Sequence, residues 1–233
     1  MSKRNVGYSG NFHNSCSFLW LMDKLDLEVR NRILVNTMAL FNKFGVRSVT
    51  MDDVAREVGM SKKTLYQYFT NKDGLVTAVA KSQMELEREE FSGIADNAKN
   101  AIDELYQIAQ CMRRNIQDMN PSLLYDLQKF HREAWQEYLK FKNDFVRGNL
   151  IDNINRGKME GFYREDLNAA ILSKFRVEQV QMIFDDKVFP TEEFEFLEVQ
   201  MHLFEHFVYG MLSEKGRELY QEYSKVEVKS SLT

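Results

Sequence analysis

Apolar side chains recur along this chain at intervals of three and four residues, which is the spacing of one face of an α-helix. The pattern predicts helices over residues 25–44, 71 into the nineties, 98–118, 121–133, 134–158, 166–185 and 191–213, with a short terminal helix to 223. No segment alternates clearly between apolar and polar residues, so strands are not expected. Pro121 and Pro190 stand at predicted helix starts, where a missing N–H costs least. The predicted fold class is all-α.

One stretch, TMDDVAREVGMSKKTLYQYFTNKDGL, follows a tighter pattern of two short helices, a turn between them, and the start of a third helix. Thr50 and Asp53 form a capping-box-like start, because the hydroxyl and the carboxylate can satisfy free backbone N–H groups. Gly59 is predicted to end the first helix, since glycine tolerates the left-handed conformation common at helix ends. Ser61 and Asn71 are predicted to cap the next two helices. The stretch predicts a helix-turn-helix.

The second of these helices is polar and basic on its outer side, with Leu65 and Phe69 pointing inward. In a helix-turn-helix the first residues of the second helix reach base edges and phosphates in the major groove. Lysines neutralise phosphates, while hydroxyls and amides position the protein or read bases. The same pattern also fits an ordinary helical hairpin whose lysines form a solvated face. A non-DNA-binding helical interaction protein therefore stays an alternative.

A wider set of residues, from about Arg32 to Leu75, carries a resemblance to a known family. The set comprises Ile33, Leu34, Leu40, Phe41, Phe44, Gly45, Ser48, Val49, Thr50, Val54, Ala55, Gly59, Ser61, Lys62, Thr64, Leu65, Tyr66, Tyr68, Phe69, Lys72 and Leu75. With the run SKKTLYQYFTNKDGL it resembles the TetR family of one-component bacterial transcription regulators. Thr37 and Met38 depart from the family where two alanines are usual, which is a change of packing. The resemblance fades after about residue 80, as is usual for a family with divergent ligand domains.

The resemblance implies a regulator that is not an enzyme, most simply a repressor that binds a palindromic operator in double-stranded DNA as a homodimer. It also implies release by a small molecule bound in the body. On this basis we expect Lys62, Lys63, Thr64 and Gln67 to lie nearest the bases. The side chains expected at phosphates are Thr50, Ser61, Tyr66, Tyr68 and Lys72.

The overall charge, −4, at first argues against DNA binding, but the charge is unevenly distributed. Between Glu28 and Lys81 there are nine Lys or Arg and five Asp or Glu, a net of +4, which leaves −8 for the rest. The sequence therefore predicts a basic DNA-binding unit on an acidic body.

The body contains an aromatic stripe at helical spacing, followed by further bulky side chains on neighbouring helices. Such a stripe is more often plain core than a binding site, but a pocket lined by aromatics and methionines would suit an apolar or aromatic effector. The candidate lining residues are Tyr106, Met112, Phe130, Trp135, Tyr138, Phe141, Phe145, Phe175 and Met182. No cofactor is expected.

His202 and His206 match the pattern H-x-x-E-H of some zinc proteases, so a metal-dependent hydrolase is a second alternative. The helix around them is strongly apolar, which favours an interface instead, and TetR proteins place their last long helix in a four-helix bundle between two copies. The residues expected at this interface are Phe196, Val199, Leu203, Phe204, Phe207 and Met211. No metal site is expected, and His131 is interpreted as an unpartnered structural residue.

The remaining features set the organisation of the chain. We expect a poorly ordered leader over 1–22, a helix-turn-helix domain over 23–72, a ligand-binding and dimerisation domain over 73–225, and a tail over 226–233. Met22 opens a run typical of regulator N-termini, which favours translation from that residue.

Cys16 and Cys111 have no metal or disulfide spacing, which suits a reducing cytoplasm. No apolar run reaches the roughly 18 residues of a membrane span.

Overall fold

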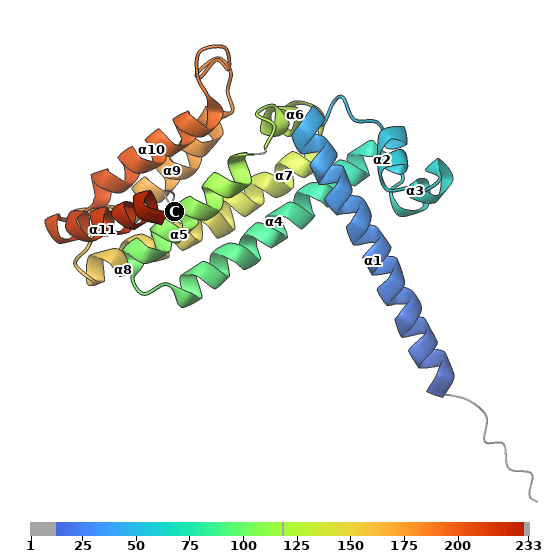
Figure 1. The fold of residues 1–233 in the computed structure, drawn as a ribbon, viewed down its shortest axis with the longest axis horizontal. Helices are drawn as coiled ribbons and strands as arrows, with labels where there is room; N and C mark the ends of the chain where they lie inside the picture. The colour runs from blue at the N-terminus through green and yellow to red at the C-terminus, as the bar shows by residue number, and fades with distance from the viewer. Residues whose placement is uncertain (1–12, 118, 231–233) are drawn as a thin grey trace, which may run out of the picture.

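A computed structural model of the chain describes residues 13–117 and 119–230, and within these residues it confirms the all-α fold. The helices are α1 (His13–Phe44), α2 (Met51–Glu57), α3 (Lys62–Tyr68), α4 (Lys72–Asn97), α5 (Ala101–Gln117), α6 (Leu123–Phe130), α7 (Arg132–Lys140), α8 (Arg147–Met159), α9 (Ala169–Ile183), α10 (Phe196–Met211) and α11 (Glu214–Ser230). A π-helical segment, η1 (Phe141–Val146), joins α7 to α8. The short helices α2 and α3 lie at one end of the molecule and α9, α10 and α11 at the other (Figure 1).

Local chemistry explains the boundaries of the helix-turn-helix. The Thr50 hydroxyl accepts from the Asp53 N–H, and the Asp53 carboxylate accepts from the Thr50 N–H at 2.9 Å, so both halves of the capping box are present. The Thr50 hydroxyl also donates to the Asp53 carboxylate at 2.6 Å, and this bond together with the one from the Thr50 N–H favours the charged form and lowers the pKa of Asp53. Gly59 has φ 68, the left-handed conformation expected after α2. Ser61 and Asn71 cap α3 and α4 as predicted.

The core of the DNA-binding unit is continuous with the body. Ile33, Leu65 and Val76 are among its most buried side chains, and they come from α1, α3 and α4. The same cluster includes Leu124 of α6 and Ala134 of α7. The expected domain boundary at residue 72 is therefore not a gap between two cores, because α4 serves both parts.

A second core fills the far end of the body, where α5, α8, α10 and α11 meet. Tyr163 closes it between α8 and α9, and its hydroxyl lies 2.9 Å from Asn153 Oδ1 and 3.1 Å from the carbonyl oxygen of Ala101. Tyr163 also forms an isolated antiparallel bridge with Leu212, which fixes the start of α11 against the loop after α8.

Four segments differ from the sequence-based expectation. Helix α1 begins at His13 instead of about residue 25, since no proline or glycine interrupts residues 13–44; residues 1–12 of the expected leader lie outside the described residues. The expected helix over 134–158 is divided by the π-helical segment. Helix α10 begins only at Phe196, because Asp185 and Asp186 accept backbone N–H bonds in turns around Pro190. At the other end α11 runs to Ser230, and residues 231–233 of the expected tail are outside the described residues.

Candidate DNA-binding and ligand-binding sites

Helix α3 presents its polar side to solvent from a firmly packed base. Leu65 is fully buried and Phe69 is 4% exposed, which anchors the inner face of the helix. Lys62, Lys63 and Gln67 are exposed, as is Tyr66. The hydroxyls of Ser61 and Thr64 cap the start of the helix. The Thr64 N–H donates to Ser61 Oγ, and the two hydroxyl oxygens lie 2.8 Å apart. The helix is therefore held rigidly with a free polar face.

Besides the capping residues Thr50, Ser61 and Thr64, three more of the expected phosphate-binding or base-reading side chains already have partners within the protein. The Lys62 ammonium lies 2.7 Å from Asp52 of α2, and this hydrogen-bonded pairing raises the pKa of Lys62. Tyr68 donates to the Asp26 carboxylate of α1, which raises the pKa of the Tyr68 hydroxyl. Lys72 donates to the backbone carbonyl of Arg47 at 3.2 Å, and burial lowers its pKa. These contacts stabilise the positions of α3 and α4. To bind DNA as well, each side chain would have to bond to both its protein partner and the DNA, or exchange one for the other.

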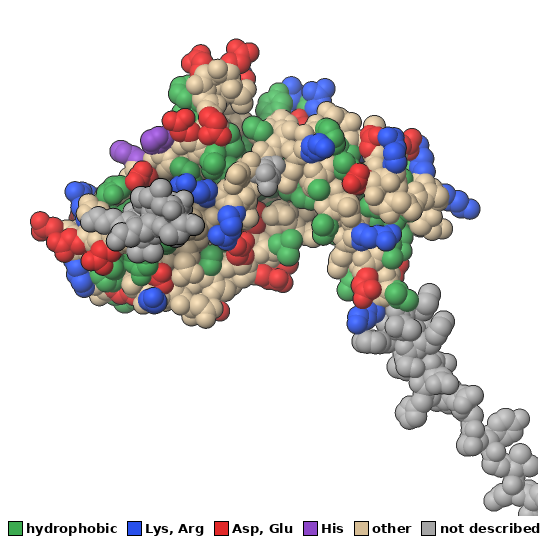
Figure 2. All heavy atoms as spheres, in the orientation of Figure 1, with side chains coloured by type: hydrophobic (Ala, Val, Ile, Leu, Met, Phe, Trp, Pro, Cys, Tyr) green, Lys and Arg blue, Asp and Glu red, His purple; other side chains and the backbone are tan. Residues whose placement is uncertain are grey.

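The surface charge follows the division predicted from the sequence. Lys and Arg side chains project around α2 and α3, whereas Asp and Glu side chains gather at the opposite end, on the loop between α9 and α10 and at the outer end of α11 (Figure 2). The acidic loop includes the exposed residues Asp185, Asp186 and Glu193. A polyanion is therefore attracted to the α3 end and repelled from the other.

A cavity of about 490 Å³ lies inside the body, within the size range of small-molecule sites. Its wall draws on most of the helices from α1 to α10, including Phe41 of α1, Met84 of α4 and Phe204 of α10. The lining is mainly apolar. The cavity therefore touches both the far end of the body and the first helix of the DNA-binding unit.

Only part of the predicted pocket lies at this cavity. Met112, Tyr138 and Phe141 line it. Trp135 stacks on Tyr138 at 5.2 Å and Phe145 on Phe141 at 5.4 Å, so these two form a layer behind the lining. The remaining four candidates face elsewhere: Tyr106 packs against Tyr223, Phe130 lies under the Arg47 guanidinium, and Phe175 and Met182 are exposed.

The cavity also contains polar residues that the sequence-based reasoning missed. Arg176 of α9 and Gln200 of α10 both line it, and they are 5% and 1% exposed. A detectable signal existed for Arg176, because it lies next to Val177 and four residues after Leu172, in phase with the buried side of its helix. Aromatic spacing alone pointed to other positions.

The predicted interface residues on α10 need a correction. Phe204, Phe207 and Met211 are no more than 5% exposed and belong to the core of the same chain, and Val199 is also buried. Phe196 packs on Phe184, and Leu203 is half-buried. The polar residues Glu198, His202, Glu205 and His206 recur at helical spacing and mark the outer side of α10, so the sequence contained a signal that the choice of interface residues overlooked.

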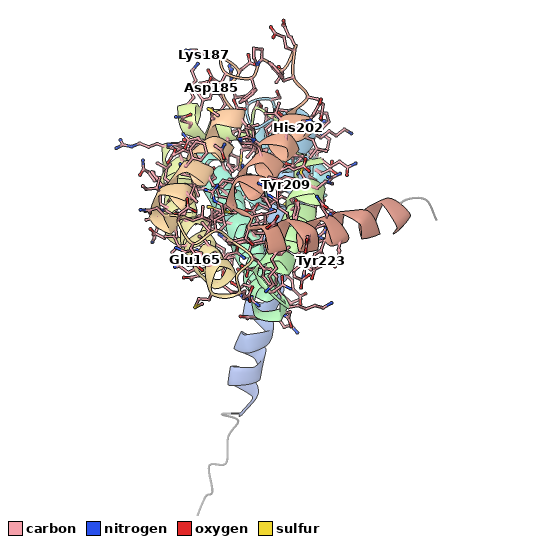
Figure 3. All side chains as sticks on the ribbon, turned by 90° about the vertical axis from the view of Figure 1, so that its left-hand side faces the viewer. Glu165, Asp185, Lys187, His202, Tyr209 and Tyr223 are labelled. Carbon is pink, nitrogen blue, oxygen red and sulfur yellow. The ribbon has the colours of Figure 1, made fainter. Side chains whose placement is uncertain are left out.

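The outer side of α10 instead carries both histidines. His202 and Tyr209 lie along the helix in Figure 3, with the loop that bears Asp185 and Lys187 above them. His202 and His206 are exposed, and His202 is 3.7 Å from Glu198. In the described part of the chain no group of three His, Cys, Asp or Glu side chains could hold a metal ion.

His131, interpreted from the sequence as unpartnered, has a defined contact. Its Nδ1 atom lies 2.8 Å from the Asp73 carboxylate, in the first turn of α4. His131 is itself buried at the junction of α6 and α7. The residue therefore ties the body to the base of the DNA-binding unit.

Comparison with known proteins decides which class of helix-turn-helix protein this is. The family described as "Bacterial regulatory proteins, tetR family" matches residues 33–79, which run from the last three turns of α1 through the first two turns of α4. The DNA-binding unit of the chain is of the TetR family. The family consists of transcription regulators and not of enzymes, so the comparison supports the DNA-binding regulator and not the hydrolase.

Individual relatives extend the similarity into the body. An uncharacterized HTH-type regulator, YvaF of Bacillus subtilis, is 34% identical over 105 residues, which are 45% of this chain and 55% of YvaF, so the match spans about half of that relative. The repressor KstR2 of Mycobacterium tuberculosis is 24% identical over 160 residues, 66% of this chain and 80% of KstR2.

Solved structures support the whole fold. A TetR regulator from Haloarcula marismortui superposes with a TM-score of 0.66 at 19% identity, covering 80% of this chain and 99% of that one. The TetR body is therefore present although its sequence has diverged. None of the helices in the described ranges combines the length and the apolar character that a membrane span requires.

Proposed function

We propose that this TetR protein is a homodimeric repressor in the cytosol, which binds a palindromic operator and is released by a small molecule. The observation that carries the proposal is α3, an exposed, basic helix on a rigid base at the basic end of the molecule. The name of KstR2 as a transcriptional repressor supports repression over activation. Lys63 and Gln67, both exposed, are proposed to reach the bases.

The proposed dimer surface lies on α9 and the outer side of α10. Ile171 and Phe175 are 64% and 53% exposed on one face of α9, and Met182 continues that face at 38%. Large apolar side chains grouped in this way on a regulator's surface indicate a protein interface. Leu203 and His202 lie on the adjacent outer side of α10. Two copies joined here would form the four-helix bundle expected of TetR proteins.

The proposed signal path runs from the cavity to the DNA-binding unit through α4 and α6. Leu124 of α6 lines the cavity and also packs in the core that holds α1 and α3. On its other side α6 supplies Asp126, whose carboxylate accepts the Arg47 N–H at 3.4 Å just before α2. The His131–Asp73 contact joins the end of α6 to α4. A ligand that displaces α6 would therefore move both ends of the DNA-binding unit.

Displacement of this kind would release DNA without weakening the contacts that either α3 can make with its own half-site. Two α3 helices on one dimer must engage successive major grooves at a fixed spacing. When a ligand favours the conformation with the wrong spacing, only one half-site can be held and the gain from bivalency disappears.

Replacing Lys63 with alanine tests the placement of α3. We expect operator binding to weaken by about 1–3 kcal/mol and the slope of log affinity against log salt to shrink by about two, since a lysine that reaches the bases also lies between the phosphates, and each dimer loses two such charges. Fluorescence anisotropy with a labelled operator at several salt concentrations measures both quantities.

Lys187→Ala is the matched control, because Lys187 is an exposed lysine on the α9–α10 loop at the far end from α3. It should change neither the affinity nor the slope. An unchanged slope in the Lys63 variant would count against a phosphate contact, though not against base readout. Equal losses in both variants would mean that only overall charge matters, and that α3 is not the DNA-binding element.

A further inference from the structure

We infer that the cavity binds an amphipathic anion, a molecule with a carboxylate or similar singly charged group on an apolar body, and that Arg176 and Gln200 hold the charged group. This inference rests on the proposed function only in assuming that the cavity is the effector site. Its central observation is a buried guanidinium without a counter-charge.

Arg176 is 5% exposed, and neither of its terminal nitrogens, Nη1 and Nη2, has a hydrogen-bond partner. Its guanidinium carbon lies 5.2 Å from the Phe204 ring and 5.9 Å from the Phe207 ring, so it is held over two aromatic faces. Burial lowers the pKa of Arg176 to about 10, which still leaves it charged at neutral pH. A buried charge of this kind is costly unless an anion pairs with it.

The other cations at the cavity wall are already neutralised. Lys142 lies 3.1 Å from the Glu178 carboxylate, and Arg114 lies 3.1 Å from that of Glu90. Within the described residues, Arg176 is the one cavity-lining cation without a carboxylate partner. Arg176 is therefore the cation with which an anionic ligand would pair.

Gln200 is the second polar residue at the Arg176 end of the cavity. It is 1% exposed, and neither its Oε1 nor its Nε2 atom has a partner. It lies one helical turn before Phe204, the ring over which Arg176 sits, so both polar side chains belong to the same end of the cavity. A planar guanidinium and an amide N–H₂ together match the two oxygens of a carboxylate.

Glu87 also lines the cavity, and a buried carboxylate could favour a cationic ligand instead of an anionic one. Burial raises the pKa of Glu87, so this group can lose its charge by taking up a proton and then donate a hydrogen bond. Arg176 cannot lose its charge in this way at neutral pH, because its pKa is about 10. Glu104, the other carboxylate at the cavity wall, is paired with Arg156 at 3.3 Å. The unbalanced charge of the cavity is therefore positive, and the apolar walls formed by Met84, Phe141 and Leu105 accommodate the body of the ligand.

Three probes with the same ten-carbon chain separate these possibilities: decanoate, decan-1-ol and decylamine. Isothermal titration of the full chain, without DNA, at about pH 7.5 keeps the carboxylate ionised. We expect decanoate to bind about ten- to a hundredfold more tightly than the alcohol, and the amine most weakly. In Arg176→Met the acid should lose this advantage while alcohol binding stays within about threefold, because the two side chains have similar length.

Arg113→Met is the charge-matched control, since Arg113 is exposed on α5 and does not line the cavity. It should keep the preference for decanoate. Arg176→Lys and Gln200→Leu carry the test if the methionine variant loses its helical circular dichroism, and each should reduce the preference severalfold. An absence of any decanoate advantage in the wild type, including no binding, overturns the proposal, as does an advantage that survives in Arg176→Met.

The same titrations keep this inference separate from the repressor proposal. Tight decanoate binding by a chain that never distinguishes an operator would leave the anion site standing and remove the repressor. Equal binding of acid and alcohol, each releasing operator DNA, would do the reverse.

Discussion

The double variant Ile171→Asp/Phe175→Asp is expected to sediment as a monomer and to bind operator DNA about 10² to 10⁴ times more weakly than the wild type. Both side chains are largely exposed on α9, so the substitution leaves the chain's own core intact. In a dimer the aspartates would be buried against each other without counter-charges, which costs several kcal/mol. Analytical ultracentrifugation and anisotropy on the same samples measure the two effects.

Met159→Asp is the control for this variant, since Met159 is 83% exposed at the end of α8 and outside the proposed surface. It should remain a dimer with normal affinity. A double variant that is still dimeric would exclude the α9 stripe as the interface. Phe204→Lys would not be a fair test, because Phe204 is buried in its own chain and the lysine would unfold the body.

Gly157→Ala is expected to lower the free energy of unfolding by about 3 kcal/mol or more. An added methyl group would lie 2.1 Å from Cδ2 of the Tyr163 ring. That ring cannot move away easily, because its hydroxyl is held near Asn153 and Ala101 inside the core. Urea denaturation at a fixed protein concentration gives the change.

Gly148→Ala, in the same helix, is the matched control. A methyl group there meets nothing within 4 Å. Since alanine favours a helix over glycine by about 0.5–1 kcal/mol, this variant should be neutral or slightly more stable. Equal stability of the two variants would show that Tyr163 does not pack against Gly157 as described.

The helix-turn-helix could be predicted from the sequence because its signals are local. Thr50, Ser61 and Asn71 each cap a helix through a backbone N–H three residues away, and Gly59 ends α2 through its own backbone. Such bonds depend on neighbours in the chain and not on distant packing. The order of helices in the body followed from periodicity for the same reason.

The faces of the body helices could not be predicted in this way. In α10 the exposed residues His202 and His206 mark the outer side, but Phe204 and Leu203 both lie away from that side and look alike in sequence, although one is buried and the other half-buried. Helix α9 shows the converse, since Phe175 is exposed and its neighbour Arg176 is buried. Which side faces inward depends on the packing of α8, α9 and α10 against each other, and that information is not local.

Discrimination between an operator and random DNA tests the central claim most directly. The full chain is titrated, at physiological salt, against DNA from upstream of its own gene and against shuffled DNA of the same length and composition. A sequence-specific regulator should prefer one upstream fragment by at least about 10³, with protection of two half-sites about one helical turn apart in a footprint. Equal affinity for every upstream fragment and its shuffled version would contradict the assignment of α3 as a reading helix.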